Sequence, residues 1–158
     1  MGLWFEPECV NEDSALFRSH PDWVVGKTDV EPCRHRNQLV LDITRPEVSD
    51  YVYSSIAKIL RKYDISYVKW DFNRDLTDNY SVSLGDRQGE FAHRYVLSVY
   101  RLAERLRSAF PDVFFEGCAG GGGRFDAGML YYFPQIWTSD NTDAHDRAEI
   151  QWGTSLAY

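Results

Sequence analysis

The feature that most constrains the fold of this chain is an order of segments that recurs along its 158 residues. A short apolar stretch is followed by a polar loop, and that loop leads into a stretch whose apolar residues have helical spacing. This alternation is typical of α/β proteins, because each helix returns the chain to the edge where the next parallel strand begins. We therefore expect an α/β fold with a parallel sheet and right-handed crossovers.

Four main strands are expected near residues 3–5, 65–70, 113–115 and 135–139, with a further short β run at 38–43. Helices are expected at residues 46–63, after a polar loop at 71–87, at 125–132, and from 144 to 158. The first of these should begin with Thr44 as its N-cap, Pro46 near the first helical position and Glu47 at the capping-box position. Pro111 should close the second helix.

Two architectures fit this pattern, namely an open doubly wound sheet and part of a (β/α)₈ barrel. A complete barrel takes ~250 residues, and this chain supplies about half of the strands that a barrel needs. If the fold is a barrel, residues 1–158 therefore form a single, partial domain.

Composition excludes several classes of partner. The chain carries 17 Lys and Arg against 24 Asp and Glu, a net charge of −7, and has no basic run, so nucleic acid is not expected to bind. It also has no apolar stretch of the ~18 residues that a membrane span requires.

Its cysteines, Cys9, Cys33 and Cys118, lack the spacing of a disulfide or zinc framework, and the N-terminus lacks a signal-peptide pattern. We expect a cytoplasmic protein without a metal site.

Acidic residues stand at or just past the ends of the four expected strands, and they are Glu6, Asp71, Glu116 and Asp140. Parallel α/β folds place their active sites at that edge of the sheet. One acidic residue at a strand end is ordinary loop composition. Four acidic side chains that converge at one edge of the sheet favour a ligand-binding site there.

Asp71 lies between two cations, Lys69 and Arg74, which should lower its pKa and keep it ionised. An ionised carboxylate can act as a nucleophile. The alternative is a buried ion pair between Asp71 and one of the two cations. Strand alternation places residues 69, 71 and 73 on one face, which fits both interpretations.

Asp140 follows Trp137 in a polar segment, a setting in which a carboxyl group can stay protonated and serve as a general acid. Alternatively, Asp140 or Asn141 is the N-cap of the final helix. The glycine-rich turn at 117–123 does not match a phosphate-binding loop, but its glycines allow close approach of the backbone to a ligand. Trp4, Trp70 and Trp137 either stack on a sugar or pack in the core.

Taken together, these residues resemble the catalytic region of glycoside hydrolase family 36, the bacterial-type α-galactosidases. The segments that carry the resemblance are GLWFEPE at 2–8, SHPDW at 19–23, RNQLVLDITRPEV at 36–48, YVKWDFNR at 67–74, FEGCAGGGGRFD at 115–126 and WTSDNTDAHDR at 137–147. They cover nearly the whole chain. The order of the K-W-D-x-N-R, C-x-G-G-G-R-F-D and S-D-N-T-D segments is specific to this family.

The resemblance implies a (β/α)₈ barrel, of which this chain holds about strands three to six. It further implies release of terminal α-linked galactose by a retaining double displacement, in which Asp71 attacks the anomeric carbon and Asp140 is the acid/base, with no metal or organic cofactor. The residues that would contact the small carbohydrate substrate are Trp4, Arg36, Lys69, Asn73, Cys118 and Gly121. Relatives of this type often form homotetramers.

The chain departs from the family in one respect, since it has no W-D-D-G-W segment, which binds the sugar in family members. The β-sandwich before the barrel and the β domain after it are also expected to be absent, so we expect the chain alone to be inactive. Three alternatives remain: a galactosyl-transferring relative of the raffinose-synthase type, an α-N-acetylgalactosaminidase, for which Cys118 leaves limited room, and a non-catalytic sugar-binding α/β module.

Overall fold

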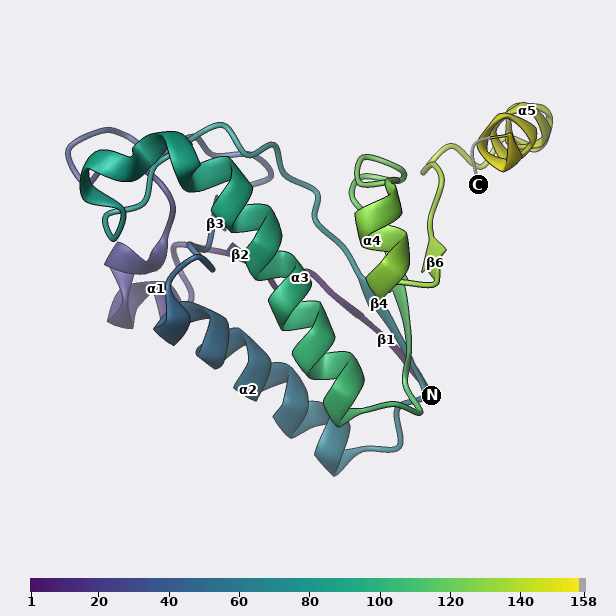
Figure 1. Ribbon diagram of the computed structural model, residues 1–158, viewed down its shortest axis with the longest axis horizontal. Helices are drawn as coiled ribbons and strands as arrows, with labels where there is room; N and C mark the ends of the chain where they lie inside the picture. The colour runs from purple at the N-terminus through teal and green to yellow at the C-terminus, as the bar shows by residue number, and fades with distance from the viewer. Residues whose placement is uncertain (157–158) are drawn as a thin grey trace.

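A computed structural model describes residues 1–156 and contains a parallel four-stranded sheet. The strands β1 (Gly2–Phe5), β4 (Tyr67–Trp70), β5 (Phe114–Gly117) and β6 (Gln135–Ile136) lie in that order, and each neighbouring pair is parallel. Helix α2 (Pro46–Lys62) leads into β4, and α3 (Phe91–Ala109) leads into β5 (Figure 1). The expected α/β fold with a parallel sheet is thereby confirmed.

The sheet has one face covered by helices and one face that they leave open. In β4, Val68 and Trp70 are each only 1% exposed and belong to the same apolar core as α2 and α3. Helix α2 contributes Val48, Val52, Ile56 and Leu60, and α3 contributes Phe91, Tyr95, Val99, Leu102 and Leu106. This spacing by three and four places each set on one side of its helix. Tyr67 and Lys69 alternate to the opposite face of the sheet.

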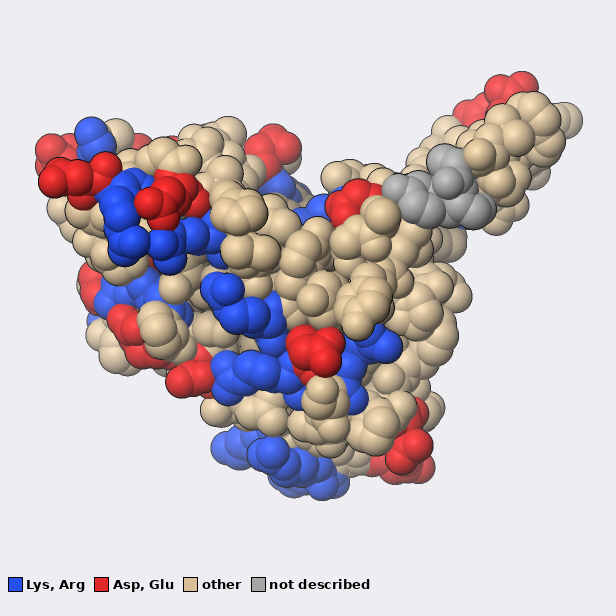
Figure 2. Space-filling view, viewed as in Figure 1, with Lys and Arg blue, Asp and Glu red and all other residues tan. Residues whose placement is uncertain are grey.

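Smaller elements complete the described chain. Strand β2 (Cys9–Val10) pairs antiparallel with β3 (Leu39–Val40) outside the main sheet. Short helical segments are α1 (Ala15–Ser19), η1 (Pro21–Trp23), η2 (Gly85–Glu90) and α4 (Ala127–Tyr132). Helix α5 (Ala144–Ser155) has no buried residue, and it projects away from the rest of the molecule (Figures 1 and 2). This helix was expected to continue to residue 158, but it ends at Ser155 with Leu156 as its C-cap, and residues 157–158 lie outside the described part of the chain.

Several local expectations were wrong. Arg45, not Thr44, is the N-cap of α2, because the Thr44 hydroxyl donates to the buried Asp42 carboxylate instead. Asp143 caps α5 by accepting from two backbone N–H groups, so neither Asp140 nor Asn141 has that role. The fourth strand ends at Ile136 rather than at 139. Pro46 does occupy the first turn of α2, as expected.

One buried ion pair ties the loop after β1 to the glycine-rich turn. Glu8 is 0% exposed and accepts from both terminal nitrogens of Arg124, at 2.7 and 2.9 Å. The same carboxylate accepts from the Trp70 indole at 2.9 Å and from the Tyr95 hydroxyl at 3.0 Å. Because all four donors meet one desolvated carboxylate, the ends of β1 and β4 and the glycine turn are held in a fixed arrangement. That arrangement positions the candidate site.

Candidate active site

Asp71 follows β4 directly, at the carboxyl edge of the sheet, and is 6% exposed. Its Oδ2 accepts from the Trp4 indole at 3.1 Å, and its Oδ1 accepts from the Phe72 backbone N–H at 2.8 Å. Strand β1 pairs with β4 so that Trp4 lies opposite Lys69, which brings the indole over the end of β4. One carboxylate oxygen is therefore oriented by a donor from the neighbouring strand β1, and the other by the backbone directly after Asp71.

The pKa of Asp71 lies below its ordinary value, although burial alone would raise it. The hydrogen bonds outweigh burial, since the Asn73 amide, the Cys118 thiol and the Trp4 indole each stabilise the charged form. The predicted direction was right, but the predicted cause was wrong. Lys69 pairs with Glu116 at 3.6 Å, and Arg74 donates to the carbonyl of Cys33 at 2.8 Å, so neither cation pairs with Asp71.

Asn73 connects Asp71 to the first strand. Its backbone N–H and its amide each donate to Glu6 Oε1 at 2.9 Å, while Gln38 donates to the other oxygen of Glu6 at 2.8 Å. The strand-end carboxylate Glu6 thus orients Asn73 beside Asp71. Strand alternation was expected to place residues 69, 71 and 73 on one face, but β4 ends at Trp70, and Asn73 reaches Asp71 from the loop that follows.

Cys118 lies beside Asp71, because its backbone N–H donates to the Trp70 carbonyl at 2.8 Å and its carbonyl accepts from the Phe72 N–H at 3.1 Å. Its thiol donates to Asp71 and accepts from the backbone N–H of Gly121, and burial raises its pKa to about 11. A neutral thiol at physiological pH is a hydrogen-bond donor, not a nucleophile.

Gly121 brings the glycine turn against the segment after β6. Its φ of +86° favours glycine, and a Cβ there would lie 2.8 Å from the Ser139 Cα and 2.9 Å from the Asp140 backbone nitrogen. Gly121 therefore allows the backbone of the glycine turn to approach the segment that carries Asp140. Only glycine allows that approach without displacing the Asp140 backbone.

Asp140 is exposed and accepts from the Trp137 indole at 3.1 Å. The Trp137 ring has a cation near it from each of two elements, with Lys69 Nζ and Arg147 Cζ both 4.6 Å from the ring centroid. Arg147 also donates to the Ser139 carbonyl at 2.9 Å. Trp137 therefore links Lys69, on the Asp71 strand, to Asp140.

Arg36 lies away from the contacts that surround Asp71 and Asp140. It has a φ of 55° at the tip of a turn closed by the His35–Gln38 bridge, and it is exposed. It borders a hollow of about 340 Å³ together with Asn73 and Gly120. The structure thus places Arg36 beside the site through this shared hollow, without a direct bond to Asp71.

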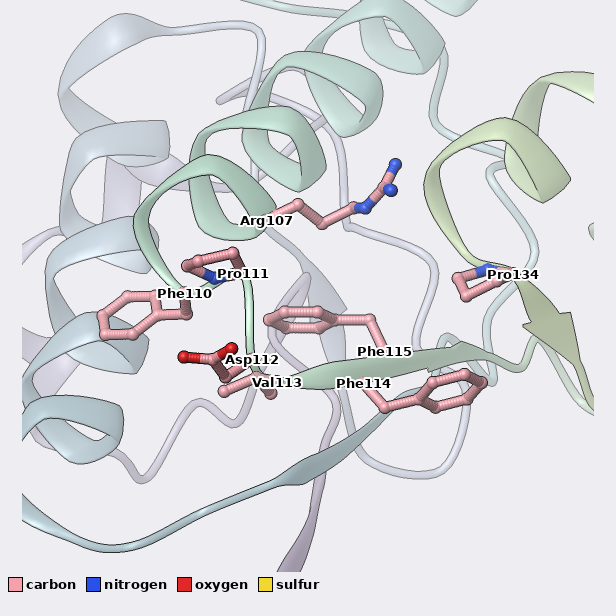
Figure 3. A pocket seen from close by; sticks show the side chains of 8 residues that line it. All are labelled: Arg107, Phe110, Pro111, Asp112, Val113, Phe114, Phe115 and Pro134. Atoms are coloured by element: carbon pink, nitrogen blue, oxygen red, sulfur yellow. The ribbon is translucent and has the colours of Figure 1, made fainter.

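Another pocket lies at the opposite edge of the sheet. Figure 3 shows Phe110 and Pro111 after α3, Phe114 and Phe115 in β5, and Pro134 before β6 around it. It is lined at the amino end of β5, whereas Asp71 and Asp140 follow the carboxyl ends of β4 and β6. This pocket therefore does not belong to the candidate active site.

Within residues 1–156, no three His, Cys, Asp or Glu side chains are grouped so that they could hold a metal ion. In the same part of the chain, no helix is both long and apolar enough to cross a membrane.

Comparison with known proteins decides the family. The sequence model of the melibiase family matches residues 1–158. The chain belongs to the melibiase family. Its resemblance to glycoside hydrolase family 36 is also confirmed, because the crystal structure of the GH36 α-galactosidase AgaA from Geobacillus stearothermophilus superposes with a TM-score of 0.96 at 53% identity. That match covers 99% of this chain and 22% of the enzyme.

One further melibiase relative and a ligand complex of the Geobacillus enzyme agree. α-Galactosidase 1 of Pediococcus pentosaceus is 53% identical over 158 residues, which are 99% of this chain and 22% of that protein. A variant of the Geobacillus enzyme in complex with raffinose superposes with a TM-score of 0.96 at 52% identity, covering 99% of this chain and 22% of the other. The chain thus spans about a fifth of the length of the curated relatives it matches, and its sheet is part of their barrel.

Sequence reasoning did not assign a role to several residues that shape this melibiase site. Glu8 and Arg124 were missed, and Glu6 and Glu116 were noted only as strand-end acids. Glu116 lies within β5 rather than after it. The signal that could have found Glu116 is its position opposite Lys69 in a parallel pair, but strand register is not readable from one sequence.

Proposed function

We propose that residues 1–158 form the central part of the barrel of a retaining α-galactosidase, with Asp71 as nucleophile and Asp140 as acid/base. Asp71 attacks the anomeric carbon of a terminal α-linked galactose while Asp140 protonates the departing glycosidic oxygen. Water, deprotonated by Asp140, then releases galactose from the enzyme. The longer protein would place a β-sandwich before this segment and a β domain after it.

The observation that carries this proposal is the hydrogen bonding of Asp71. A nucleophilic carboxylate has to be ionised and held still, and Asp71 has donors on both oxygens and a lowered pKa. Asp140, by contrast, is exposed, which suits a group that must exchange a proton with water in each cycle.

The sugar contacts follow from the same geometry. The exposed Trp4 ring, at 52%, offers an apolar surface for a galactose face, and Lys69 and Asn73 offer donors for its hydroxyls. Cys118 and Gly121 bring the glycine turn toward the sugar, and Arg36 reaches it from the hollow beside Asn73. The raffinose complex of the Geobacillus relative supports a small α-galactoside as substrate. The proposed mechanism needs no cofactor.

The proposal extends to the cellular setting and the assembly. A cytoplasmic location is consistent with three free cysteines, and a homotetramer would be an assembly of the longer protein.

The test uses the longer protein that carries this segment, called the parent enzyme below. We expect it to hydrolyse p-nitrophenyl α-galactoside and to release α-galactose first, as observed by proton NMR, because two inversions retain configuration. Release of β-galactose first would contradict the double displacement. A folded parent enzyme that binds galactosides without hydrolysis would favour the sugar-binding alternative, and preferential transfer to sucrose would favour the raffinose-synthase type.

We further expect the isolated 158-residue chain to be inactive on the same substrate, because the open edges of β1 and β6 have no pairing strand among the described residues.

A further inference from the structure

Glu116 is an acidic side chain buried in the open face of the sheet. It is 3% exposed and lies in register with Lys69 of β4 on one side and Gln135 of β6 on the other. Burying a carboxylate is costly unless donors replace the lost water. Here the Tyr67 hydroxyl donates at 2.7 Å, the Gln135 amide donates, and Lys69 Nζ lies 3.6 Å away.

These three partners connect Glu116 to different parts of the site. Tyr67 and Gln135 hold the carboxylate from two neighbouring strands. Lys69 remains 25% exposed and extends to the Trp137 ring, 4.6 Å from its centroid. Trp137 in turn donates to Asp140 at 3.1 Å. Glu116 is therefore the buried end of a chain of contacts that reaches the proposed acid/base.

A lysine side chain needs such an anchor when it must bind a ligand. Its long, flexible stem and compact ammonium lose much rotamer freedom if they are to hold one position. A carboxylate already fixed by Tyr67 and Gln135 restricts the ammonium before any sugar arrives, so less freedom is lost on binding.

We propose that Glu116 is a positioning residue that fixes the Lys69 ammonium between its own carboxylate and the Trp137 ring, ready to bind the galactose hydroxyls. The proposal rests on the proposed function. It assigns to Glu116 no contact with substrate and no part in proton transfer. Its effect on the reaction passes through Lys69.

The test is a double-mutant cycle in the parent enzyme, with kcat and KM measured on raffinose for Glu116→Gln, Lys69→Met and the double variant. We expect Glu116→Gln to lower kcat/KM about tenfold, largely through a higher KM. The amide keeps the size of the side chain but is uncharged, so the ion pair with the Lys69 ammonium is lost. In the Lys69→Met background, the same substitution should change kcat/KM by less than about twofold.

Tyr67→Phe removes one hydrogen bond to Glu116 and leaves the Lys69 pair in place. Because the Gln135 amide still holds the carboxylate, we expect kcat/KM to fall by less than for Glu116→Gln. Glu104→Gln, exposed on α3, is the matched control, with kcat/KM expected to stay within about twofold of the unmodified enzyme. If Glu116→Gln does not fold, Glu116→Asp takes its place in the cycle, because it keeps the charge but draws it back from Lys69.

Additive losses in the two single variants would overturn the proposal, because Glu116 would then act independently of Lys69. An unmodified parent enzyme without activity on raffinose would contradict the proposed function instead. The two failures are therefore distinguishable.

Discussion

The ends of β4 and β6 carry the two proposed catalytic carboxylates, and they hold them very differently. Asp71 follows a strand with neighbours on both sides, is 6% exposed, and has donors on both oxygens. Asp140 follows a two-residue strand at the edge of the sheet, is exposed, and accepts from the Trp137 side chain. The helix after it, α5, buries no residue.

The difference fits the two chemical roles proposed for the carboxylates at this sheet edge. A nucleophile works by being charged and fixed, which strand register and donors on both carboxylate oxygens provide. An acid/base works by gaining and losing a proton, which access to water provides. If substitution of the two carboxylates had the same effects on activity, this contrast would be wrong.

The largest effect should come from Asp71→Asn in the parent enzyme. The amide keeps the shape of the side chain but cannot attack the anomeric carbon, so kcat on p-nitrophenyl α-galactoside should fall by about 10⁴-fold or more. Asp64→Asn is the matched control, since Asp64 is exposed between α2 and β4, and its activity should be unchanged. Substantial residual activity in Asp71→Asn would remove Asp71 from the nucleophile role.

Asp140→Asn should have a smaller effect that depends on the leaving group. Raffinose needs its departing oxygen protonated, so kcat should fall by about 10²–10⁴-fold, whereas p-nitrophenol leaves readily and the loss should be less. Kinetics on both substrates measure the difference, with Glu149→Gln, exposed on α5, as the control. Equal losses on the two substrates would count against Asp140 as the acid.

The smallest effect should be a shift in pH dependence from Trp4→Phe. The pKa of Asp71 is lowered in part by the Trp4 indole, so removing that donor raises it. Since the protonated carboxyl group cannot attack, activity is lost as pH falls through this pKa. The acid limb of kcat/KM should therefore move to higher pH. An unchanged limb would mean that the indole does not stabilise the charged form of Asp71.

Regular elements were the most predictable part of this molecule. The spacing of Val48, Val52, Ile56 and Leu60 is a property of the sequence alone, and α2 follows it closely. Proline at position 46 marked its start for the same local reason. The order of strands and crossovers also follows from local segment type, so the parallel α/β sheet could be predicted.

Contacts between strands could not be predicted, because they depend on register. Lys69 and Arg74 flank Asp71 in sequence and were expected to lower its pKa, yet the pairing of β4 with β5 directs Lys69 to Glu116. Thr44 was expected to cap a helix, but its hydroxyl donates to Asp42 two residues earlier, a buried carboxylate that also accepts from the distant Ser81. In each case a residue distant in sequence, or its burial, outweighed the local signal.

Covalent trapping tests the central claim most directly. The parent enzyme would be incubated with a 2-fluoro galactosyl fluoride probe, which forms the glycosyl-enzyme but slows its hydrolysis, and intact mass and peptide mapping would locate the adduct. We predict one fluorogalactosyl group on Asp71, absent from the Asp71→Asn variant. An adduct on another residue, or none on an enzyme that hydrolyses α-galactosides, would contradict the assignment of Asp71 as the nucleophile.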